Sequence, residues 1–82
     1  MALSEKLIED GRVEEGIRFL ELEIELAPGK VWLIRKAAQA CIANARPEKA
    51  LKLAEQGLAL KPEDEALATV KADAEEDLGL RE

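Results

Sequence analysis

The sequence predicts an all-α protein, and three observations support this prediction. The 82-residue chain is rich in Ala, Leu, Glu and Lys, which favour helices, and only 2% of it is aromatic. Single prolines and glycines separate stretches of helical periodicity, as turn residues do. Related segments also recur at a spacing of 34 residues. A chain of this length makes one domain, and we expect about five helices in it.

We expect helices near 2–10, 13–27, 30–44, 47–60 and 63–79. Pro47 fits the first turn of the fourth helix, and Gly11 and Gly29 mark the turns after the first and second. Pro62 precedes three acidic residues, and acidic side chains favour a helix N-terminus. These local signals agree with the division into five helices.

The stretch FLELEIELAPG, residues 19–29, alternates apolar and acidic residues like a half-buried strand. At 100° per residue it instead forms two opposed apolar stripes on one helix. The first stripe, which we expect to be buried, contains Ile17, Leu20 and Ile24, and the second contains Phe19, Leu22 and Leu26. We therefore interpret the stretch as a helix, and we count Leu26 and its counterpart Leu60 as core.

Phe19 and Leu22 have two interpretations. A neighbouring helix could partly cover them, or they could form an exposed contact for a second copy or another protein, where their burial would contribute roughly 3–5 kcal/mol. The second interpretation makes a homodimer possible.

Composition argues against several classes of function. There is no histidine or tyrosine, and Ser4 and Thr69 are the only hydroxyl residues, so we expect no enzyme, no metal site and no cofactor. Residues 30–62 have a net charge of +5, but the acidic segments on both sides would repel nucleic acid. No apolar run could span a membrane. With one cysteine, Cys41, which we expect to be buried, a cytoplasmic location fits best.

The internal repeat organises the chain. GRVEEGIRFLELEIELAPGK aligns without a gap on ARPEKALKLAEQGLALKPED, and Pro28 matches Pro62 at a spacing of 34 residues. In this frame Gly16 matches Ala50 and Leu20 matches Ala54.

With this period the chain resembles the tetratricopeptide repeat (TPR) family, whose units are antiparallel helix pairs. The small positions of the family's pattern and its proline match this chain, while the large aromatic positions hold smaller residues. The pattern positions are Ile34, Ala37, Ala38, Cys41, Ala50, Ala54 and Pro62 in the second unit, and Leu3, Ser4, Leu7, Gly16, Leu20 and Pro28 in the first. The resemblance implies one domain with repeat one at 1–29, repeat two at 30–62 and a capping helix at 63–82. Glu23 stands where the family usually has a small packed residue.

The resemblance also implies a concave groove, lined by the first helix of each unit, that binds a peptide or helix of a partner protein. Its preferred contact residues here are Trp32, Arg35, Lys36, Gln39, Glu5 and Ile8, and the capping helix would add Thr69, Ala72 and Glu76. Trp32 is the best hot-spot candidate, although it could equally fold over the turn at Pro28 and Gly29. The carboxylate clamp of chaperone-adaptor TPR proteins is not expected, because only Lys36 is cationic at the matching positions.

The resulting hypothesis is a protein-binding module that acts as an adaptor, a scaffold or a small assembly chaperone. One alternative is a self-assembling module joined through Phe19 and Leu22. Another is an engineered or excised fragment of a longer repeat array.

Overall fold

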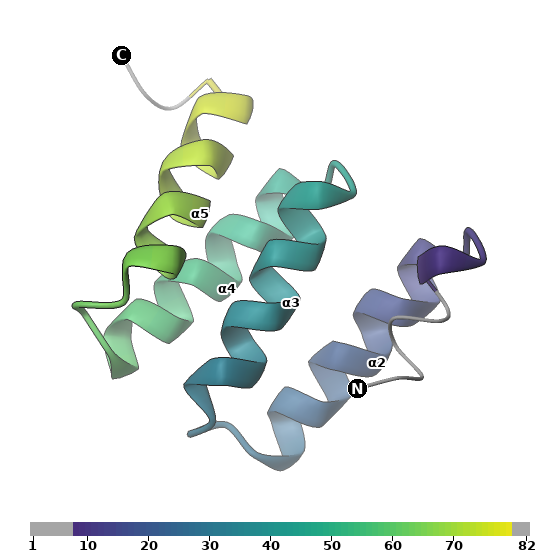
Figure 1. Ribbon diagram of the computed structural model, residues 1–82, viewed down its shortest axis with the longest axis horizontal. Coiled ribbons are helices and arrows are strands. Elements are labelled where there is room, and N and C mark those ends of the chain that lie inside the picture. The colour runs from purple at the N-terminus through teal and green to yellow at the C-terminus, as the bar shows by residue number, and fades with distance from the viewer. Residues whose placement is uncertain (1–7, 80–82) are drawn as a thin grey trace.

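The computed structural model describes residues 8–79 and places four helices among them (Figure 1). They are α2 (Val13–Leu26), α3 (Val31–Ala43), α4 (Pro47–Leu60) and α5 (Glu65–Asp77). Each differs from its predicted range by two residues or fewer at either end, and the described residues contain no strand. The helix expected near 2–10 falls mostly outside the described residues, although residues 8 and 9 are helical. The all-α prediction is confirmed, and so are four of its five helices.

Consecutive helices run antiparallel and are joined by short turns (Figure 1). Helix α3 is central, because α2, α4 and α5 all pack against it. Helix α4 also packs against α5, whereas α2 contacts only α3 among the four helices. The arrangement therefore leaves α2 and α4 on one side of α3 without direct backbone packing between them.

The core lies between these helices and consists of small and branched apolar side chains. Its fully buried members are Ile17, Leu20, Ile34, Ala37, Ala38, Cys41, Ala50, Ala54, Leu67 and Ala74. The prediction that one stripe of the strand-like stretch is buried is confirmed, since α2 buries Ile17, Leu20 and Ile24. Many alanines on facing helices allow close approach, as the small slots of a helical repeat require.

The prediction that Leu26 and Leu60 are core residues is wrong. Leu26 is 87% exposed and Leu60 is 50% exposed. Each stands at the last position of its helix, immediately before the chain turns away. No described helix covers that end of either helix well enough to bury its leucine.

Local signals account for the helix ends. Pro47 occupies the first turn of α4, as predicted, and Asp64 caps α5 by accepting a hydrogen bond from the Leu67 backbone N–H at 3.0 Å. The turn after α3 is a Schellman motif, with Arg46 N–H bonded to Cys41 O at 2.8 Å and Ala45 N–H to Ile42 O at 3.4 Å. Ala45 has a φ of 60° there, a conformation that glycine adopts more easily.

Gly57 is the glycine that packing requires. A Cβ atom at this position would lie 2.5 Å from Leu67 Cδ1 and 3.1 Å from Ile34 Cγ2. Both neighbours are fully buried, so they have little room to move. Gly57 therefore lets α4 approach α3 and α5 at once.

Candidate functional site

The residues predicted to bind a partner share one face of α3. Trp32, Arg35, Lys36 and Gln39 follow the spacing i, i+3, i+4 and i+7, which places them on one side of a helix. The other side carries the buried residues Leu33, Ile34, Ala37, Ala38 and Cys41. Trp32 is 51% exposed, Gln39 is exposed, and the two cations are half-buried. The face therefore offers an accessible aromatic ring beside polar groups.

Arg35 makes an ion pair with Asp64 that the sequence analysis did not predict. Arg35 Nη2 lies 2.7 Å from Asp64 Oδ2, and Nε of the same guanidinium lies 3.0 Å from it. The hydrogen bond from Arg35, together with that from the Leu67 backbone, holds the pKa of the Asp64 carboxyl below its usual value. The pair joins α3 to the N-terminus of α5. Arg35 is thus committed to positioning α5, and only part of its side chain faces solvent.

The other residues predicted to line the partner-binding groove lie outside α3. Thr69 and Glu76 are exposed on α5, Ala72 is half-buried there, and α5 packs beside α3. Ile8 is half-buried, and Glu5 lies outside the described residues. Helices α3 and α5 thus lie side by side, and the shared surface remains a prediction.

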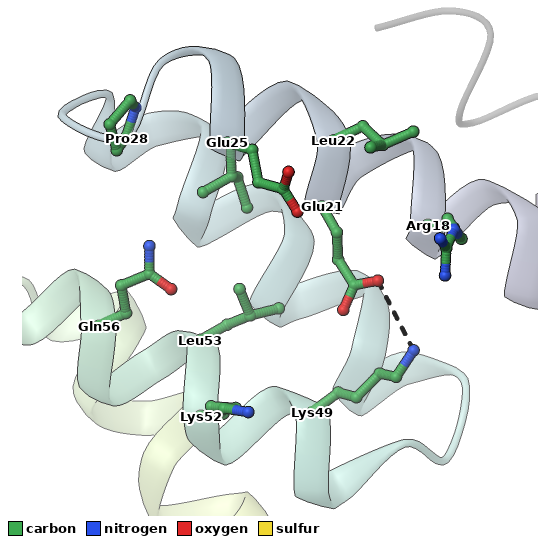
Figure 2. Close-up of a pocket in the computed structure, with 10 residues that line it drawn as sticks. Arg18, Glu21, Leu22, Glu25, Pro28, Lys49, Lys52, Leu53 and Gln56 are labelled. Carbon is green, nitrogen blue, oxygen red and sulfur yellow. Dashed lines mark ion pairs between the residues drawn. The ribbon is translucent and has the colours of Figure 1, made fainter.

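A second surface lies on the opposite pair of helices. Between α2 and α4 is a groove of about 510 Å³, which we call the α2/α4 groove (Figure 2). Its lining residues are Arg18, Glu21, Leu22, Ile24, Glu25, Pro28, Lys49, Lys52, Leu53 and Gln56. Of these, only Leu22 was a predicted interface residue, and it is 48% exposed. Phe19, its predicted companion, does not line the groove and is half-buried.

The two walls of the α2/α4 groove carry opposite net charges, although Arg18 also lines the α2 wall. Glu21 and Glu25 project from α2, while Lys49 and Lys52 project from α4 (Figure 2). One ion pair crosses the groove, with Lys49 Nζ 3.7 Å from Glu21 Oε1. The sequence feature that corresponds to the basic wall is the pair Lys49 and Lys52, which are three residues apart and so share one face of a predicted helix. The acidic wall corresponds to the glutamate-rich second helix.

A charged cluster closes one end of this side of the molecule. Arg46 pairs with Glu14 at the start of α2, and its Nη1 donates a hydrogen bond to Asn44 O at 2.7 Å. Lys49 Nζ also lies 3.9 Å from Glu14 Oε1. These contacts tie the turn after α3 to the first turn of α2. Because all of these side chains are substantially exposed, each pair contributes little to stability.

Cys41 is buried, as predicted. Burial raises the pKa of its thiol to about 11, so the reactive thiolate is scarce at neutral pH. Within residues 8–79, no group of three or more Cys, Asp or Glu side chains is arranged to hold a metal ion. In the same part of the chain, no helix is both long and apolar enough to cross a bilayer.

Comparisons with known proteins agree with the helical arrangement. A search of the curated proteins finds no match to the chain. The sequence profile described as tetratricopeptide repeat matches residues 2–74, which is most of the chain. Repeats of this family generally mediate protein–protein interaction, and the family is typically non-enzymatic. The antiparallel helices and the 34-residue period fit that profile, and the chain belongs to the tetratricopeptide repeat family.

Proposed function

We propose that this chain binds a segment of another protein on the face of α3 that carries Trp32, Lys36 and Gln39. The observation that carries the proposal is the half-exposed indole of Trp32 on a helix whose other face is buried. Tryptophan is strongly enriched among the residues that dominate binding energy at interfaces. An exposed ring on a rigid helix contributes contact area with little loss of side-chain entropy.

Family membership supports the choice of a protein partner. The chemistry of the face suggests a peptide or helix with an apolar side chain for the Trp32 ring. The Gln39 amide can donate and accept hydrogen bonds, which suits an exposed peptide backbone or a polar side chain. Arg35 acts as a positioning residue in this proposal, because its bond to Asp64 sets α5 beside the contact face. The protein would serve as an adaptor, a scaffold or a small assembly chaperone, and its buried unpaired cysteine is compatible with the cytoplasm.

The test is a selection of random short peptides on the immobilised full chain. Trp32 is the only tryptophan, so its fluorescence should shift when a selected peptide binds. We expect Trp32→Ala to weaken binding by about 10-fold or more. The same substitution should change the melting temperature little, because half of the ring is already in water.

Leu22→Gln, on the α2/α4 groove, is the matched control and should leave peptide binding unchanged. If the selected peptides instead keep their affinity for Trp32→Ala and lose it for Leu22→Gln, the proposal is wrong about the face. A large fall in the melting temperature of Trp32→Ala would mean that the ring packs over its own turn.

A further inference from the structure

The α2/α4 groove combines features that suit pairing with a second copy. Its lining includes the buried side chains of Ile24 and Leu53 and the exposed side chain of Leu22 on α2. Figure 2 shows Leu22 and Leu53 on the two helices that form the groove. Leu26 continues the exposed stripe one turn further along α2. Two leucines on adjacent turns form an apolar strip beside a hollow, and such strips mark contact surfaces.

The charges on the two groove walls favour a second copy of this chain as the binding partner. The α2 wall of the groove has a net negative charge, with Glu21 and Glu25 outweighing Arg18, and the α4 wall is basic. In a two-fold dimer the same patch meets itself, so each group must find a complementary group on the same patch. If the two-fold axis runs along the groove, the α2 wall of one copy faces the α4 wall of the other. Acid then faces base on both sides of the axis.

The groups needed for this pairing are available. Glu25 on α2 and Lys52 on α4 line the groove, and neither makes an ion pair or hydrogen bond with any residue described in the structure. Glu21 and Lys49 are already paired with each other across the groove. The unpaired acid and base on opposite walls are therefore positioned to bind across the axis.

We propose that two copies of this chain associate through their α2/α4 grooves, with Leu22 of each copy against the groove of the other and Glu25 facing Lys52 across the axis. The proposal does not depend on the peptide-binding function, because Trp32 lies on a different face. Each 14-residue helix is about 21 Å long, so a patch two helices wide gives an interface at the low end of the usual area range. The dimer should accordingly be reversible.

The test is sedimentation equilibrium of the full chain from about 1 µM to 1 mM, the range in which a small interface dissociates. We expect the wild-type mass to rise reversibly toward a dimer. Leu22→Gln should weaken association by about 10-fold or more, because both copies lose an apolar contact. Glu25→Lys and Lys52→Glu should each weaken it as well, because each places like charges on both sides of the axis.

A mixing experiment distinguishes this geometry from any other. In a mixture of Glu25→Lys with Lys52→Glu, the introduced lysine of one chain faces the introduced glutamate of the other, and the remaining native pair is also attractive. The mixture should therefore form a heterodimer at concentrations where each variant alone associates more weakly than the wild type. Asp73→Lys, an exposed charge reversal on α5, is the control and should dimerise like the wild type.

Three results would overturn the proposal. A wild-type chain that stays monomeric up to 1 mM, the top of that range, does not use the groove in this way. A dimer that survives Leu22→Gln and Glu25→Lys, or a mixture that fails to restore association, uses another surface or another symmetry. Circular dichroism of each variant confirms that it is folded before its mass is interpreted. Trp32→Ala should dimerise like the wild type. The dimer proposal and the peptide-binding proposal can therefore fail independently.

Discussion

Helices α2 and α4 occupy matching places in the repeat but differ in how they are held. α2 spans Val13–Leu26 and α4 spans Pro47–Leu60, so both ends are offset by the 34-residue period. Helix α4 packs against α3 on one side and α5 on the other, whereas α2 packs only against α3 among these helices. The same periodic pattern therefore produces one enclosed helix and one that presents more of its surface.

One pair of matching positions shows the difference at atomic scale. Gly57 on α4 is buried and lets Leu67 and Ile34 approach the backbone closely. Its counterpart on α2 is Glu23, whose Oε1 atom is buried and has no hydrogen-bond partner among residues 8–79. A small residue thus accompanies tight packing in one unit, and a long acidic side chain occupies the same place in the other. Three substitutions test whether this contrast controls stability.

The largest effect is expected for Gly57→Glu, which gives α4 the residue that α2 has. The new side chain would collide with Leu67 and carry a carboxylate into the core, at a cost of about 3–5 kcal/mol or more. Since a domain of this size is stabilised by roughly 4–12 kcal/mol, this cost removes a large part of the stability, and the melting temperature should fall by roughly 12 °C or more. Thermal and urea unfolding followed by circular dichroism measure the change.

Gly57→Ala is the matched control for this variant. The added Cβ would still crowd Leu67, at about 1–3 kcal/mol, and the better helix propensity of Ala, about 1 kcal/mol, should offset only part of that cost, so we expect a smaller loss of stability than for Gly57→Glu. If Gly57→Glu melted at the wild-type temperature, close packing at Gly57 would not distinguish the two units.

The opposite exchange, Glu23→Ala, should stabilise the protein by about 1 kcal/mol. It removes a buried oxygen that lacks a hydrogen bond and improves helix propensity, while losing some contact by the side-chain stem. The melting temperature should rise by about 4–8 °C. Glu55→Ala, an exposed glutamate on α4, makes the same chemical change without the buried oxygen and should give a much smaller rise. Equal rises in melting temperature for both variants would show that the gain comes only from the higher helix propensity of Ala.

A smaller effect is expected from Asp64→Asn, which tests how α5 is attached to the better-packed unit. Asparagine can still cap the helix, so the variant removes chiefly the charge that pairs with Arg35. We expect a fall of a few degrees in melting temperature at pH 7, since the pair is only partly shielded from water.

The pH dependence follows from the lowered pKa of Asp64. A carboxyl whose pKa is lower in the folded state stabilises the fold above its ordinary value near 4, and that stabilisation is lost as the pH falls through the lowered value. The wild-type and Asp64→Asn melting temperatures should therefore converge as the pH falls below about 4. A difference that stays constant over this range would mean that the charge of Asp64 is not what the substitution removes.

Much of the fold could be predicted because the signals are local or periodic. Pro47 begins α4 as expected, since its fixed φ and missing N–H suit a first turn. The strand-like stretch resolves into a helix because Ile17, Leu20 and Ile24 recur at helical spacing, and the structure buries all three. The shared face of Trp32, Lys36 and Gln39 also follows directly from spacing along α3.

What the sequence alone determined, then, is where the helices lie, which residues share a face, and which family the chain belongs to. These properties depend on intervals along the chain, which set the angle of each side chain about its own helix axis. The tertiary structure alone decided that Leu26 and Leu60 are exposed, that Arg35 reaches Asp64 across 29 positions, and that oppositely charged walls face each other between α2 and α4. Those properties depend on which helix packs against each face. Helical periodicity does not specify the distance between two packed helices.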